Sequence, residues 1–207
     1  MESLIEKLCD DLEPVKCTRH PLLCSSTWVV VSAIIMGLLI WKIGVRADLA
    51  DIMHVPEFFF EIILVACIGI SATYCAALLR VPDMRGHNWA LTVPLTMTGV
   101  LALWKGIYIA LGHFHMPHLD FHHCMGEGLL IVAAPGLFMF VMAAQGFTTR
   151  PVWMSVMNGL AVASVGYLAL RFTCASEDLG HALYTHLLPF IVVGTVFGFL
   201  ARRLYKW

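Results

Sequence analysis

The sequence predicts an all-α, polytopic membrane protein in which six transmembrane helices form one bundle behind a short N-terminal amphipathic helix. Of its 207 residues, 59% are hydrophobic and 13% are charged, and the formal net charge is −1. Soluble domains carry about 25% charged residues. The composition therefore excludes an ordinary soluble domain, a disordered chain and a direct nucleic-acid binder that depends on bulk positive charge.

Six apolar segments account for the predicted bundle. A transmembrane helix needs about 20 mostly apolar residues to cross roughly 30 Å of hydrocarbon. Backbone groups in lipid must bond internally, so segments of this length are helices rather than barrel strands. The segments that qualify are residues 25–43, 58–79, 89–111, 127–146, 152–171 and 181–200. The chain thus divides into a head, residues 1–24, and a transmembrane domain, residues 25–207.

The basic residues predict how the bundle is oriented. Four of the 13 Lys and Arg residues lie on one set of connections, namely Lys42, Arg46, Lys105 and Arg171. The other nine lie on the opposite set, and the side richer in Lys and Arg is normally cytoplasmic. We therefore expect both termini, and the head with them, to be cytoplasmic.

Histidines are concentrated on the predicted outer face, where eight of the ten lie. Imidazole with thiolate and thioether suits Cu, and imidazole with thiolate and carboxylate suits Zn. Two interpretations are open: the histidines form an ordinary interfacial loop between headgroups and water, or they bind a Cu or Zn ion, the one cofactor that the sequence suggests. The predicted ligands are His113, His115, His118, His122, His123, Cys124, Cys174, His181 and His186.

Two cysteines, Cys124 and Cys174, fall in different outer loops. They could form a disulfide if their Cα atoms lie within about 7 Å of each other. They could instead remain thiols that react with oxidants or bind soft metals. The sequence leaves both alternatives open.

The head contains a short amphipathic helix. Leu4, Ile5, Leu8 and Leu12 form one apolar stripe, and Pro14 ends it. A helix of this length is unstable alone in water. Because the head is more acidic than basic, docking into a protein groove is favoured over binding to anionic lipid. The alternative is a loosely ordered tail.

Two charged residues lie at membrane depth, Glu61 in the second predicted span and Lys105 in the third. We expect them to pair with each other or to extend towards the interface. No row of ionisable groups crosses the bilayer, which argues against a transporter. A membrane redox protein or a haem- or metal-binding enzyme is the main alternative function. It would need histidines deep in two facing spans, and the first five spans have almost none.

The head reads Leu4-Ile-Glu-Lys-Leu-Cys-Asp-Asp-Leu-Glu-Pro-Val15 and is followed by Arg19-His-Pro21. This opening resembles that of the NrsF family, bacterial inner-membrane proteins named as negative regulators of a sigma factor. The likeness continues through six spans to Cys124, to Cys174 with Glu177-Asp178 and His181, and to the basic C-terminal end.

This resemblance implies an anti-sigma factor, not an enzyme, that binds an extracytoplasmic-function sigma factor. Together with the apolar stripe, it gives the expected partner-binding residues as Leu4, Ile5, Leu8, Asp11, Leu12, Pro14 and Val15. Cys124 and Cys174 match the family's outer cysteines, which are tied to signal reception. The histidine density at 113–123 departs from the family pattern, so the stimulus stays open between metal, oxidant and envelope stress.

Overall fold

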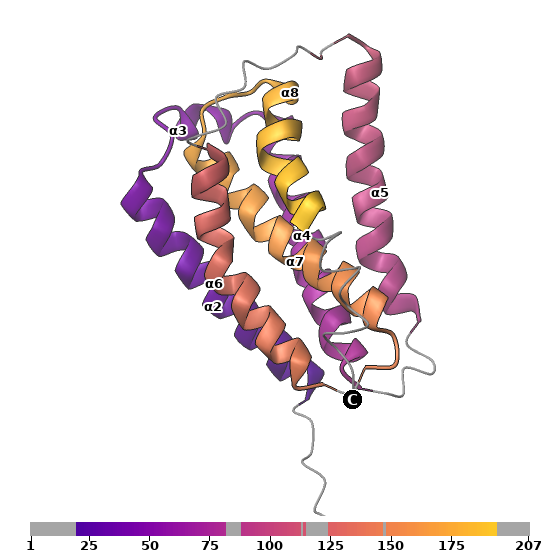
Figure 1. The fold of residues 1–207 in the computed structure, drawn as a ribbon. Helices are drawn as coiled ribbons and strands as arrows, with labels where there is room; N and C mark the ends of the chain where they lie inside the picture. Colours follow the sequence, from indigo (N-terminus) through magenta and orange to yellow (C-terminus); the bar gives the residue numbers. More distant parts are fainter. Residues whose placement is uncertain (1–19, 82–87, 113, 115–123, 147, 194–207) are drawn as a thin grey trace, which may run out of the picture.

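The computed structural model describes residues 20–81, 88–112, 114, 124–146 and 148–193, and every regular element among them is helical (Figure 1). This confirms the predicted fold class. The elements are α2 Pro21–Ile43, α3 Leu49–Ile52, α4 Pro56–Leu79, α5 Trp89–Ala110, α6 Cys124–Ala144, α7 Pro151–Thr173, α8 Leu179–His181 and the π-helix η1 Ala182–Leu187.

Five helices, α2, α4, α5, α6 and α7, are long and apolar enough to cross a membrane. They correspond to the first five predicted spans. The sixth predicted span begins with one apolar helix, Leu179–Val193, which is shorter than a full span. It consists of α8, η1 and the α-helical residues 188–193. Residues 194–200 of that predicted span lie outside the described residues.

Prolines set the beginnings of three spans slightly earlier than predicted. Pro21, Pro56 and Pro151 each occupy the first turn of their helices. Proline fits there because its fixed φ suits a helix and its missing N–H is not needed. At α2, the Nδ1 atom of His20 also accepts a hydrogen bond from the backbone N–H of Leu22, at 3.3 Å. The helix therefore begins ahead of predicted residue 25, inside what the sequence assigned to the head.

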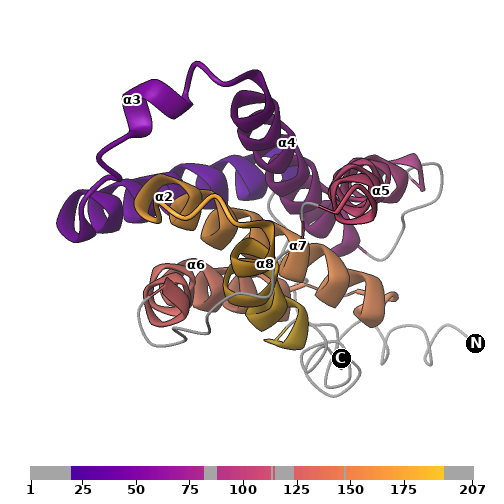
Figure 2. The ribbon, with the colours of Figure 1, turned by 90° about the horizontal axis from the view of Figure 1, so that it is seen from above.

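Helix α7 is central in the bundle, where it packs against α4, α6, α2 and η1. Helix α5 packs mainly on α4 and stands at the flank of the bundle (Figure 2). Residues 44–55 and 174–178 lie at the end that is drawn uppermost in Figure 1, which we call the upper end. The start of α2 and the ends of α4 and α6 define the lower end.

Small residues let α4 and α7 approach closely. A Cβ atom added at Gly69 would lie 2.9 Å from the Cβ of Ser164, and Ala72 is completely buried. Small residues at such contacts are typical of helices that pack within a membrane.

Between α2 and α6, the indole N–H of Trp28 donates to the carbonyl oxygen of Pro135 at 3.0 Å.

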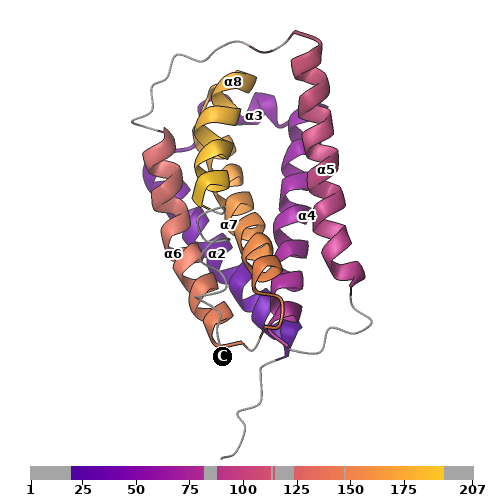
Figure 3. The same ribbon diagram turned by 45° about the vertical axis from the view of Figure 1, so that its right-hand side comes forward.

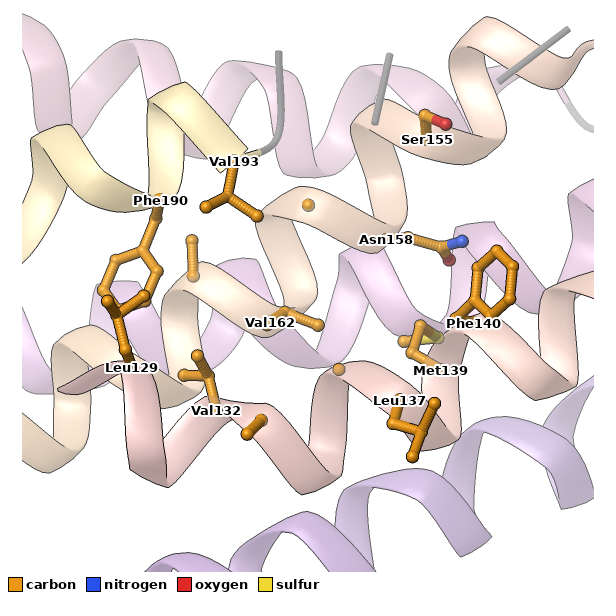
Figure 4. A pocket seen from close by; sticks show the side chains of 14 residues that line it. Leu129, Val132, Leu137, Met139, Phe140, Ser155, Asn158, Val162, Phe190 and Val193 are labelled. Atoms are coloured by element: carbon orange, nitrogen blue, oxygen red, sulfur yellow. The ribbon is translucent and has the colours of Figure 1, made fainter. Parts of the chain in front are cut away.

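An apolar cavity of about 440 Å³ lies between α6, α7 and the helix Leu179–Val193 (Figure 4). Phe190 lies at one end of it, and the polar side chains of Ser155 and Asn158 lie towards the other. No charged residue lines this cavity. The charged and metal-ligating groups of the described residues therefore lie elsewhere.

We predict that Gly166→Ala destabilises the protein by about 1–3 kcal/mol, the usual cost of overpacking. A Cβ atom at this position would lie 2.7 Å from Cγ1 of Val132 and would overlap the ring of Phe190. Thermal unfolding of the purified protein in detergent measures the effect. The control is Gly99→Ala in α5, where no atom lies within 4 Å of the new Cβ. Equal stability of the two variants would contradict the packing described here.

Candidate functional site

A buried carboxylate, that of Glu61 in α4, joins α4 to α5 and α7. Glu61 is 3% exposed. Its Oε1 atom accepts a hydrogen bond from the hydroxyl of Tyr167 and lies 2.9 Å from Nζ of Lys105. Its Oε2 atom lies 3.5 Å from Nη2 of Arg171. Of the two alternatives that the sequence left open for Glu61 and Lys105, the structure shows the pairing. A buried charge requires such a partner.

The contacts of Arg171 extend this ion pair towards the upper end. Nη2 of Arg171 lies 3.1 Å from Oε2 of Glu177, whose Oε1 lies 2.5 Å from Nη1 of Arg46. Arg46 in turn holds both carboxylate oxygens of Asp48 at 2.7 Å. Acidic and basic groups thus alternate along an ion-pair chain, which consists of Asp48, Arg46, Glu177, Arg171, Glu61 and Lys105.

Arg46 is the fixed centre of the outer half of this chain. Its side chain is fully buried, its backbone N–H donates to the carbonyl of Phe172 at 3.0 Å, and its Nη2 donates to the carbonyl of Ala175 at 3.4 Å. The ring of Phe58 lies 5.9 Å from its guanidinium carbon and 4.8 Å from that of Arg171. These contacts hold the 174–178 segment against the loop after α2.

The hydrogen bonds of Arg46 also change two pKa values. The bonds to Asp48 and, to a smaller extent, Glu177 raise the pKa of Arg46 above its ordinary value. The same guanidinium lowers the pKa of Asp48. The pairing of Asp48 therefore stabilises the fold above the ordinary pKa of an aspartate and is lost as the pH falls through the lowered value.

Three metal-ligating side chains meet beside this chain at the upper end, and we call them the Cys/His cluster: Cys174, His181 and His186. Their donor atoms all lie within 4.8 Å of one another. Sγ of Cys174 lies 3.5 Å from Nε2 of His181. The carboxylate of Asp178 caps the backbone N–H of His181 at 2.9 Å and fixes the start of that helix.

A π-helical turn brings the two histidines of the cluster together. In an α-helix of 3.6 residues per turn, positions five apart point about 140° away from each other. In η1, the N–H of Leu188 instead bonds to the carbonyl of Leu183, five residues back. This wider turn places His181 and His186 with ring centroids 5.2 Å apart. Such turns are frequent at functional sites.

His186 is the member of the cluster whose buried polar atoms lack hydrogen-bond partners among the described residues. It is completely buried, and neither ring nitrogen has a hydrogen-bond partner among the described residues. The edge of the Tyr167 ring lies against it, at a centroid separation of 6.2 Å. Leaving a buried polar group unpaired costs about 1–3 kcal/mol. A ligand that bonded to one of these nitrogens would remove that cost.

Three of the nine predicted ligands are therefore brought together. The positions of His113, His115, His118, His122 and His123, and the side chain of Cys124, lie outside the described residues. The two alternatives for Cys124 and Cys174, and the expected contacts of the head, remain predictions for the same reason.

The sequence reasoning missed five members of the site, Arg46, Asp48, Tyr167, Arg171 and Glu177. The sequence analysis places Arg171 in a connection between spans, yet it is 5% exposed near the end of α7. A signal was present, because Tyr167 and Arg171 are four residues apart and so share one face of an otherwise uncharged helix. Arg46 and Glu177 are 131 residues apart in sequence, and no local pattern links them.

These helices and their charged upper end define an all-helical, polytopic membrane protein with a buried ionic network and a potential metal-binding cluster. The family model described as "NrsF: Negative regulator of sigma F" matches residues 8–207. The chain belongs to this family, which confirms the resemblance and makes the protein a negative regulator of a sigma factor. No curated protein and no solved structure matches it.

We predict that Glu61→Gln destabilises the bundle by about 3 kcal/mol, the lower end of the range for breaking a buried ion pair. The lower end applies because Lys105 is partly exposed and Arg171 keeps its contact with Glu177. The control is Glu57→Gln, one turn earlier in α4, where the exposed side chain forms no ion pair among the described residues. Unfolding in detergent measures both, and an unchanged midpoint for Glu61→Gln would contradict the role assigned to this carboxylate.

Proposed function

We propose that this protein is an anti-sigma factor of the bacterial inner membrane with a periplasmic sensor. In this proposal, the head, residues 1–24, holds an extracytoplasmic-function sigma factor at the membrane. A periplasmic metal or oxidant acts at the Cys/His cluster, together with Cys124, and causes release. The observation that carries the proposal is the meeting of one thiol and two imidazoles in a member of a sigma-regulator family.

The distribution of basic residues supports a periplasmic position for the cluster. The few cations on the upper side, Lys42, Arg46, Lys105 and Arg171, contrast with nine elsewhere in the chain. Three of the four are neutralised in the ion-pair chain. The positive-inside rule then places the upper end outside and both termini in the cytoplasm. Signal and sigma factor are thus on opposite sides of the membrane.

The spacing of the cluster suits a metal ion. Zinc binds sulfur at about 2.3 Å and nitrogen at about 2.0–2.1 Å, so two ligands of a tetrahedral ion lie about 3.5 Å apart. Cys174 and His181 already have a separation of 3.5 Å. The nitrogen of His186 lies within 4.8 Å of both and would complete the set with a small movement. The same thiolate and imidazole donors also suit copper.

The position of the cluster gives a route by which binding would change the bundle. Cys174 lies between Arg171 and Glu177 along the chain, and Tyr167 contacts both His186 and Glu61. Drawing the three ligands together would shift the 174–178 segment and therefore the ion pairs that position α4, α5 and α7. Moving a two-state equilibrium from 1:99 to 99:1 requires about 5.5 kcal/mol. Structural zinc sites supply about 10–16 kcal/mol in total, so a site that is complete in only one of the two states has enough binding free energy for such a difference.

We predict that the purified full-length protein binds one Cu⁺ or Zn²⁺ ion per chain and that His186→Leu weakens this binding. The loss should exceed the roughly 10–100-fold that removal of an outer-shell partner costs. In cells, the same variant should accumulate normally but fail to induce a sigma-dependent reporter on metal addition. Cys124→Ser, Cys174→Ser and the double variant should share one unresponsive phenotype, because a two-cysteine switch needs both members.

The matched control is His54→Leu, an exposed histidine in the loop before α4 at the same end of the bundle. It should bind metal and respond as the wild type does. Normal induction by Cu, Zn, Cd and peroxide in the double cysteine variant would refute the sensing role. Wild-type metal affinity in His186→Leu would refute the metal site.

We also predict that Leu8→Asp combined with Leu12→Asp abolishes capture of the sigma factor but leaves membrane insertion intact. The two charges would disrupt the apolar stripe that is proposed to dock, while the spans are untouched. Pull-down of the sigma factor from solubilised membranes is the measurement, and Lys7→Ala on the polar side of the head is the control. Undiminished capture by the double variant would contradict docking through the stripe.

A further inference from the structure

A second cavity, of about 300 Å³, lies at the upper end between α4, α5, α7 and α8. None of the three Cys/His cluster residues lines it. Its aromatic walls include Trp104 and Tyr108. Unlike the apolar cavity of Figure 4, it contains charged groups of both signs, namely Glu57, Glu61, Lys105, Arg171 and Glu177.

The two cations of this cavity have donors to spare. An ammonium has three N–H donors, and the Lys105 ammonium forms one ion pair, with Glu61, among the described residues. A guanidinium has five donors, and the contacts of Arg171 with Glu61 and Glu177 both use Nη2. Nε of Arg171 is buried and has no hydrogen-bond partner among the described residues. An anionic oxygen in the cavity would accept from both side chains.

The carboxylates of the same cavity favour a cation. Glu57, in the first turn of α4, is exposed and forms no ion pair within the described part of the chain. The side chain of Glu177 is 48% exposed despite its two arginine contacts. A purely anionic ligand would be repelled by these two groups, and a purely cationic one by Lys105 and Arg171. A zwitterion satisfies both sets.

The depth of the cavity matches the lipid headgroup region. Glu61 lies five residues after Pro56 and Lys105 five residues before Ala110, the respective ends of α4 and α5. At 1.5 Å per residue this is about 7.5 Å, and each headgroup layer is about 5–7 Å thick. Trp104 extends the aromatic wall at this level, where membrane proteins concentrate Trp and Tyr. At the upper end, α5 and α8 stand on either side of α4 (Figure 3).

We infer that this cavity binds the headgroup of a zwitterionic phospholipid that carries a phosphodiester and a primary ammonium, as phosphatidylethanolamine does. The phosphodiester oxygens accept hydrogen bonds from the Lys105 ammonium and from the Arg171 guanidinium. The ammonium donates to Glu57 and Glu177. The apolar side chains of Phe58 and Leu179, which also line the cavity, contact the start of the acyl chains.

Native mass spectrometry of the full-length protein in detergent tests this inference. The protein is delipidated and then offered equimolar phosphatidylethanolamine, phosphatidylcholine and phosphatidylglycerol. One phosphatidylethanolamine per chain should be retained with a preference of about tenfold over the other two, the effect expected of a charge-assisted hydrogen bond. Equal retention of the three lipids would overturn the proposal. Competition by water-soluble glycerophosphoethanolamine at the same concentration would also overturn it, because the ligand would then be a soluble phosphate ester.

Two variants test recognition of the ammonium and of the phosphodiester separately. Glu57→Gln should abolish the preference for phosphatidylethanolamine, and Lys105→Gln should weaken binding of all three lipids about tenfold. The controls are Asp51→Asn and Lys42→Gln, exposed residues at the same end of the bundle, which should bind lipid as the wild type does. If Lys105→Gln does not fold, Glu57→Gln decides, since its side chain supports no ion pair in the described structure. Wild-type selectivity in Glu57→Gln would overturn the proposal.

Discussion

The carboxylate of Glu61 determines how the upper end of the bundle is arranged. A charge buried among apolar helices is tolerated only when its partners reach it, and here they come from α5 and α7. Helix α5, which packs mainly on α4, gains a contact that specifies its depth and rotation. Arg171 pairs with Glu61 and also with Glu177, and this second contact fixes the segment after α7.

The ion-pair chain and the Cys/His cluster are parts of one structure, since residues 171–181 contribute to both. The close contact of Gly69 with Ser164 joins α4 and α7 along their buried faces. Close-packed interfaces of this kind transmit strain rather than absorb it. A displacement that begins at Cys174 therefore has a mechanical path to the lower end, which the proposed orientation places in the cytoplasm.

The features that the sequence could predict are those that depend on local composition. Apolar length predicts six spans, and five of them are full-length helices among the described residues. The isolated charges of Glu61 and Lys105 predict that they either pair or extend to the interface, and the structure shows the pair. The outer half of the ion-pair chain depends on loops from opposite ends of the sequence, as with Arg46 and Glu177, so periodicity gives no sign of it. His181 and His186 were each predicted as ligands, but α-helical geometry places them on different faces. Only the π-helical turn unites them.

That turn also controls the register of the helix that follows. The same wide turn that aligns His186 with His181 sets the rotation at which Phe190 meets Gly166 on α7. Removing one residue between the two histidines would leave them four positions apart, and such positions lie on one face of an ordinary α-helix, so both contacts could persist. Adding a residue instead would turn every later side chain by about 100°. The π turn therefore tolerates the loss of one residue better than the gain of one.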